Sequence, residues 1–157
     1  MNEIERLEGQ LKRSFEGEAW HGPSLLELLE DVTPQEAYAH PVPAAHSIWE
    51  LVLHLTATYG LVLRRLRGDA VQLTPSEDWR TVASSAPSEW REALSSLRRA
   101  NEELRKAVLG FRRAKLDEPL VPEPPYTAYT QFIGITQHDL YHAGQIAVLK
   151  KALRLAD

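Results

Sequence analysis

Apolar residues recur along most of this chain at steps of three and four positions, which is the spacing of one buried helix face. In the first stretch, Ile4, Leu7, Leu11 and Phe15 follow that spacing. Three later stretches repeat it over greater lengths. The pattern predicts four long helices, at residues 3–15, about 45–67, 88–110 and about 129–153.

Residues that usually begin helices add detail to this prediction. Ser88 is expected to cap the third long helix. Pro23 and Ser24 precede a cluster of leucines, which predicts a short helical piece. That piece is either separate or a continuation of the first helix beyond Gly22.

Prolines mark the connections between the helices. Residues 40–43 are expected to be extended, Pro75 and Pro87 bracket a polar connection, and four prolines make residues 116–129 a crossing loop. No strand pattern competes over a comparable length. The prediction is one all-α domain over residues 1–157, a four-helix bundle with at least one crossover connection.

Composition narrows the classes of function. The formal net charge of −4 gives no overall attraction to nucleic acid or to an anionic membrane, so neither is an expected partner. The absence of cysteine excludes disulfides, thiolate metal ligands and a cysteine nucleophile. No apolar run reaches the length of a bilayer and the N-terminus lacks an apolar signal core, so the cytoplasm is the expected location.

Three histidines in two of the predicted helices are the candidates for chemistry. His138 and His142 are four residues apart, so their rings lie on one face of the last helix, as two ligands of one ion require. His54 lies in the most apolar part of the second long helix, where burying an unpaired imidazole costs on the order of 1–3 kcal/mol. We predict that the three imidazoles bind one divalent metal ion. The alternative is three core histidines bonded to backbone or hydroxyl groups.

Three neutral ligands leave the double charge of an ion uncompensated and its fourth position open, as in catalytic sites. Glu50 precedes His54 by one turn and is interpreted as a fourth ligand, a general base or an acceptor for an imidazole N–H. A surface or salt-bridged Glu50 is an equal alternative. Asp139 takes the place of glutamate in the H-E-x-x-H metalloprotease motif, but its shorter side chain disfavours a protease. We expect Asp139 to orient a ligand or to pair on the surface.

Other polar and aromatic residues receive more ordinary interpretations. His21 and His46 lie at predicted helix starts and are expected to cap helices or to belong to loops. Gln137, Tyr141 and Gln145 are candidates to hydrogen-bond a ligating imidazole, but packing is their preferred role. Trp20 and Trp49 are candidates to wall a pocket, and packing in the core is again preferred.

Two segments resemble the signature segments of the DinB/YfiT-like family of metalloenzymes. They are residues 46–54 (HSIWELVLH) and 138–146 (HDLYHAGQI), and residues 20–24 (WHGPS) resemble a stretch seen in one branch. The similarity spans nearly the whole chain. It implies a four-helix bundle with up-down-down-up connections, often dimeric, that holds a divalent metal on the three matching histidines, His54, His138 and His142.

The resemblance also implies a range of activities. The family includes metal-dependent transferases and isomerases that use a low-molecular-weight thiol, and some members are named as hydrolases. We therefore expect a metal-dependent homodimeric enzyme that activates such a thiol or a water molecule against a small-molecule substrate. Zinc, nickel, iron and manganese are the candidate ions, because imidazole suits several of them. The alternative is a non-catalytic module in which the bundle and its metal serve as a binding or dimerisation scaffold.

Overall fold

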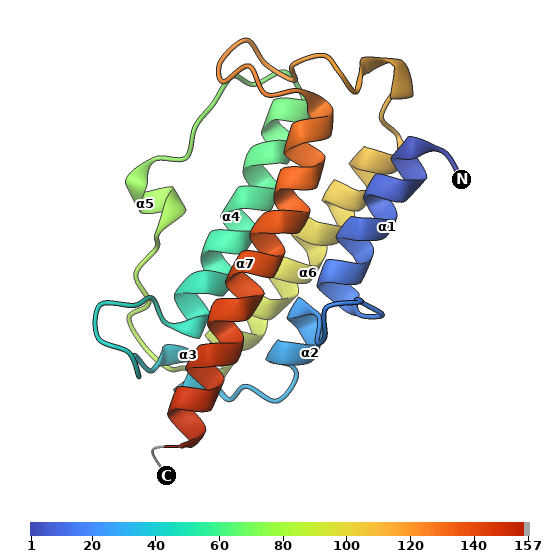
Figure 1. Cartoon of the computed structure of the whole chain (residues 1–157). Helices are drawn as coiled ribbons and strands as arrows, with labels where there is room; N and C mark the ends of the chain where they lie inside the picture. The colour runs from blue at the N-terminus through green and yellow to red at the C-terminus, as the bar shows by residue number, and fades with distance from the viewer. Residues whose placement is uncertain (156–157) are drawn as a thin grey trace.

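The computed structural model describes residues 1–155, and helices dominate that part of the chain. Four long helices lie side by side, α1 (Glu3–Glu16), α4 (Ile48–Leu66), α6 (Pro87–Leu109) and α7 (Ala128–Arg154) (Figure 1). Shorter pieces are α2 (Leu25–Leu29), α3 (Pro34–Tyr38), α5 (Pro75–Asp78) and a 3₁₀ turn at Arg113–Lys115. Within residues 1–155 the only β pairing is a single bridge between Pro119 and Thr127. The predicted all-α class is confirmed.

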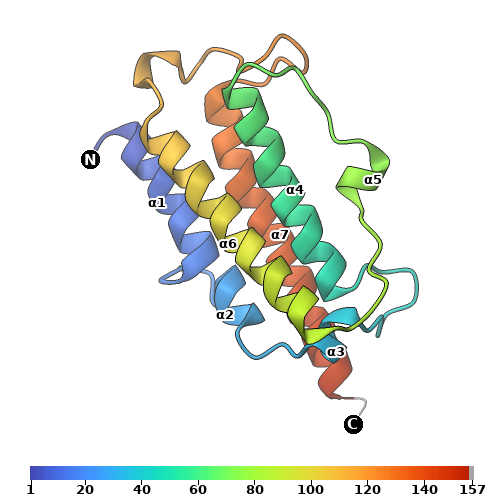
Figure 2. The ribbon, with the colours of Figure 1, turned by 180° about the vertical axis from the view of Figure 1, so that it is seen from behind.

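Side-chain contacts fix the relative directions of three long helices. Tyr59 on α4 donates to Asp139 on α7, and Arg65, further along α4, donates to Gln131, which lies earlier on α7. Partners that advance along α4 therefore retreat along α7, so these two helices are antiparallel. α4 and α6 instead begin at the same end of the bundle (Figures 1 and 2).

The rings of Trp49 and Trp90 lie in the first turns of α4 and α6, and their centroids are 5.1 Å apart. These two helices are therefore parallel, and the connection at residues 67–86 returns along the length of the bundle (Figures 1 and 2). This connection, which includes α5, is the crossover. The segment predicted to cross, residues 116–129, instead joins α6 to α7 at one end of the bundle, and its last two residues already belong to α7.

Two short helices were not predicted, although the sequence contains their start signals. α3 and α5 each follow a threonine and begin with a proline, whose fixed φ suits the first helical position. Thr33 and Glu36 form a capping box for α3, and Thr74 and Glu77 form one for α5. The crossover therefore contains a local helix that helps to shape it beside α4.

The start of α6 differs from the predicted one, and α2 takes one of its two predicted alternatives. Ser88 does not cap α6, because the helix already begins at Pro87, with Ala86 as an N-cap that makes no side-chain hydrogen bond. The short α2 is a separate helix and not a continuation of α1. Its own capping box, formed by Ser24 and Glu27, begins it afresh.

The apolar faces of the long helices meet in one core. Trp49 is buried there, as the packing interpretation predicted, and the indole N–H of Trp90 donates to the carbonyl of Val32 at 3.1 Å. Trp20 is fully exposed, so its predicted packing role is wrong. No helix within residues 1–155 combines the length and apolar character that a membrane span needs.

Candidate metal centre

The structure brings the three predicted imidazoles together between α4 and α7. The Nε2 atom of His138 lies 2.9 Å from Nε2 of His54 and 3.1 Å from Nε2 of His142. All three candidate ligand atoms lie within 4.8 Å of one another. Because α4 and α7 are packed neighbours, two side chains one turn apart on α7 reach the same position on α4. His54 and His142 are buried, and His138 is partly buried.

Hydrogen bonds on the far side of two rings fix their tautomers. Nδ1 of His54 lies 3.0 Å from the backbone carbonyl of Asp78 and 3.0 Å from its Oδ1, both of which only accept. Nδ1 of His142 lies 2.7 Å from Oε1 of Gln145. Both rings therefore donate outward from Nδ1 and direct the lone pair of Nε2 inward, as histidine ligands of metals usually do.

A shared cation satisfies this arrangement better than a shared proton. Nε2 of His54 and Nε2 of His142 are both acceptors, and one proton on Nε2 of His138 bonds well to only one of them. One divalent ion accepts all three lone pairs. Nδ1 of His138 has no hydrogen-bond partner in residues 1–155 and is equally unsatisfied in both arrangements, so it does not discriminate. The donor set fits a divalent metal.

Electrostatics keep the site in the form that binds metal. Burial, together with the neighbouring imidazoles of His142 and His54, lowers the pKa of His138 to about 3. Burial also lowers the pKa of His142, against a smaller opposing effect of its hydrogen bond to Gln145. Both rings are therefore neutral near pH 7, and no proton has to be lost before they coordinate.

The crossover adds two residues that the sequence interpretation missed. Asp78, at the end of α5, accepts from His54 as described, and the ring of Trp79 stacks on His54 with centroids 4.1 Å apart. Trp79 also stacks on His46 at 3.5 Å. An ion pair of 3.6 Å between Arg64 and Glu77 helps to hold the same segment on α4. No periodicity or motif connects residue 78 with residue 54, so only the fold reveals this contact.

Removing the side chain of Asp78 tests how His54 is oriented. Support of this kind is typically worth 10–100-fold in metal affinity. For Asp78→Ala we expect a loss below about tenfold, because the backbone carbonyl at 3.0 Å remains as an acceptor for Nδ1 of His54. Zinc titration of the variant measures the change. A hundredfold loss would show that the carboxylate, and not the carbonyl, holds the ring.

Comparisons with known proteins agree with this architecture. A family model described as the DinB superfamily matches residues 19–146. The chain belongs to the DinB superfamily. The crystal structure of a conserved protein from Enterococcus faecalis is similar, with a TM-score of 0.63 and 19% sequence identity over 97% of each chain, which supports the fold alone. No curated protein matches this DinB-superfamily chain.

Glu50 makes no hydrogen bond to the three clustered imidazoles of this DinB-superfamily protein. Its Oε2 accepts from the backbone N–H of Ser47 at 2.8 Å and completes the capping box of α4. The same oxygen lies 3.1 Å from Nε2 of His40 and 3.5 Å from Nδ1 of His46. Glu50 is therefore a capping residue with histidine partners, and its predicted roles as metal ligand or acceptor for a ligating imidazole are not supported. The spacing Ser47-x-x-Glu50 was the signal for a cap.

The two capping residues separate stability from metal binding. Glutamine also completes a capping box, so Glu50→Gln should leave zinc affinity unchanged. Ser47→Ala removes the other half of the box and should lower the free energy of unfolding by about 1 kcal/mol. Zinc titration and chemical denaturation of both variants measure these effects. Weakened zinc binding in Glu50→Gln would restore Glu50 to the metal centre.

Asp139 also points away from the metal centre. It is fully buried, with Oδ1 accepting from the hydroxyl of Tyr59 at 2.7 Å and Oδ2 lying 3.4 Å from Oγ of Ser14. The expectation of surface pairing is wrong, and no hydrogen bond links Asp139 to His138 or His142. Burial raises the pKa of Asp139 to about 7, against the lowering effect of the two hydroxyl donors.

The remaining candidates divide between support and surface. Gln145 supports His142, so the packing interpretation is wrong for it. Tyr141 is exposed and packs edge-on against the ring of His142, with centroids 5.0 Å apart. Gln137 and His21 are exposed, and His46 lies in a loop as predicted.

Proposed function

We propose that this protein is a divalent-metal-dependent enzyme that activates a low-molecular-weight thiol or a water molecule for attack on a small electrophile. The convergence of three imidazole Nε2 atoms on one point carries the proposal. His54, His138 and His142 would hold the ion. When bound, such an ion supplies a Lewis acid that lowers the pKa of a thiol or water at its open position.

The protein's own residues set the conditions for that chemistry. Asp78 and Gln145 hold the rings of His54 and His142 in the ligating tautomer. Trp79 covers one face of His54 and limits the access of water from the side of the crossover. The reaction would form a C–S or C–O bond at the electrophilic carbon, while the leaving group departs with its bonding electron pair and the proton of the thiol or water passes to solvent.

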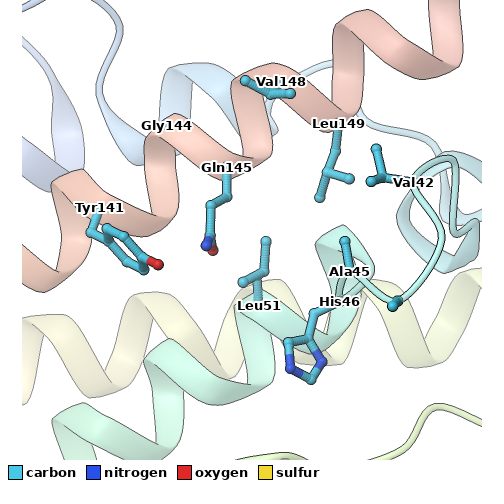
Figure 3. A pocket seen from close by; sticks show the side chains of 10 residues that line it. Val42, Ala45, His46, Leu51, Tyr141, Gly144, Gln145, Val148 and Leu149 are labelled. Atoms are coloured by element: carbon cyan, nitrogen blue, oxygen red, sulfur yellow. The ribbon is translucent and has the colours of Figure 1, made fainter.

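An enzyme fits the surroundings of the site better than a metal-stabilised scaffold. A structural site is normally closed by four protein ligands, whereas a catalytic site keeps one position open. Within residues 1–155, the group of possible ligands contains three histidines and no fourth histidine or carboxylate. A cavity is also lined by Gln145, the residue that is hydrogen-bonded to His142 (Figure 3). The identity of the ion, the homodimer and the cytoplasmic location stay predictions.

Two assays on zinc-loaded protein without a histidine tag test the proposal. One supplies a small thiol with an aryl halide electrophile, and the other supplies aryl esters without any thiol. The His54→Ala variant is the control in both. Turnover that needs thiol and His54 supports a thiol transferase, and turnover of ester that needs only His54 supports a hydrolase. Bound zinc with no turnover in either assay would favour the scaffold.

A further inference from the structure

A cavity of about 540 Å³ lies between the segment before α4 and the second half of α7. Most of its lining is apolar, and no acidic side chain contributes (Figure 3). Its volume lies within the range of 300–1,000 Å³ that is usual for small-molecule sites. The apolar lining residues are Val42, Ala44, Ala45, Leu51, Val148 and Leu149.

Gln145 places one polar group between this cavity and the metal centre. Because Nδ1–H of His142 donates to Oε1 of Gln145 at 2.7 Å, the amide oxygen is committed to the ring. The same amide therefore offers its Nε2 hydrogens as donors. Figure 3 shows the Gln145 side chain reaching from α7 toward Leu51, beside the ring of Tyr141.

The side of the cavity opposite α7 is also linked to the metal centre, through His46. His46 lines the cavity and stacks on Trp79, which stacks in turn on His54. A molecule in the cavity is therefore one residue, Gln145, away from His142, and two residues, His46 and Trp79, away from His54. The cavity combines an apolar body, a hydrogen-bond donor and proximity to the centre.

We propose that this cavity binds the apolar chain of an acyl compound, whose carbonyl or carboxylate oxygen accepts a hydrogen bond from Gln145. That this compound is the substrate rests on the proposed function. That it binds in the cavity does not. An alkylammonium ion of equal length offers the same apolar body but only donors, so it leaves the Nε2 hydrogens of Gln145 without an acceptor. Specificity for an acceptor over a donor is the signature of this site.

Octanoate and octylammonium are the probes, and calorimetric titration of zinc-free protein measures their binding. Removing zinc prevents the carboxylate from reaching the protein through a metal bond. We expect octanoate to bind and octylammonium to bind at least about tenfold more weakly. Ala45→Phe, which fills the cavity, should abolish octanoate binding, and Ala70→Phe, at an exposed position after α4, should leave it unchanged.

Gln145→Glu separates the donor from the cavity. The carboxylate still accepts from Nδ1 of His142, but it cannot donate to octanoate and repels it. Octanoate affinity should fall at least about tenfold. Helical circular dichroism and a thermal melt show that each variant is folded.

Three results would overturn the proposal: equal binding of octanoate and octylammonium, undiminished octanoate binding in folded Ala45→Phe, or undiminished binding in Gln145→Glu. The outcome is independent of the metal. Selective octanoate binding in a chain that binds no zinc would leave the acyl site standing while the proposed function fails. Zinc-dependent turnover without octanoate selectivity would do the reverse.

Discussion

Replacing His54 with alanine is expected to lower the affinity for zinc on the order of a hundredfold or more, and His142→Ala is expected to do the same. Four-ligand zinc sites have apparent binding free energies of about 10–16 kcal/mol, or roughly 3 kcal/mol for each ligand. Each factor of ten corresponds to about 1.4 kcal/mol. Calorimetric titration of untagged protein with zinc measures the change.

His21→Ala is the matched control for these variants. His21 is exposed on the loop after α1 and lies outside the group of three imidazoles, so its removal should leave zinc affinity unchanged. Zinc bound equally by the wild type, His54→Ala and His142→Ala would show that the three rings form a core cluster without metal. Equal losses in all variants, including His21→Ala, would indicate binding at the surface.

Thermal stability gives an independent reading of the same site. An ion that binds only the folded state at a hundred times its Kd stabilises that state by about 2.7 kcal/mol. The melting temperature of the wild type should therefore rise with zinc, and the melting temperatures of His54→Ala and His142→Ala should not. The contrast separates coordination within the fold from binding to an unfolded chain.

The long helices could be predicted because each buries one face over several turns. The starts of α1, α4 and α7 were therefore placed within a few residues of their observed positions. α3 and α5 have only five and four residues, which is too short for a periodic pattern, and their capping boxes were their only signal. Neither the periodic pattern nor the capping signals predicts which connection is the crossover, because that depends on which helices become neighbours.

The metal ligands could be predicted because helical spacing and burial both constrain them. Two histidines one turn apart share a face, and a histidine in an apolar run needs a partner. The supporting residues are different in kind. Asp78 and Trp79 reach His54 from the crossover, 24 and 25 positions along the chain, and only the path of that connection brings them there.

Asp139 follows His138 directly on α7, but its side chain has different surroundings. One residue of an α-helix turns by about 100°, so a side chain beside His138 in sequence faces a different part of the bundle. Asp139 faces Tyr59 and Ser14 in the interior, with no cation among its hydrogen-bond partners. When a carboxylate in such a place is ionised, it destabilises the folded state.

Asp139→Asn should therefore change how stability depends on pH. Burial raises the pKa of Asp139 to about 7 in the folded chain, whereas an unfolded aspartate titrates near about 4. The folded state keeps its proton over that window, so the wild type loses about 4 kcal/mol of unfolding free energy as the pH rises from about 4 through about 7. Asparagine stays neutral, so the unfolding free energy of the variant should rise relative to that of the wild type over the same pH range.

Denaturation of metal-free wild type and Asp139→Asn between pH 4.5 and 8 measures this difference. Metal-free protein is used because a divalent ion on His138 would itself favour the ionised carboxylate. Asp69→Asn, at an exposed position beyond α4, is the matched control and should show a constant difference from the wild type. A constant difference for Asp139→Asn as well would mean that the hydroxyls of Tyr59 and Ser14 stabilise the charged carboxylate as fully as water does.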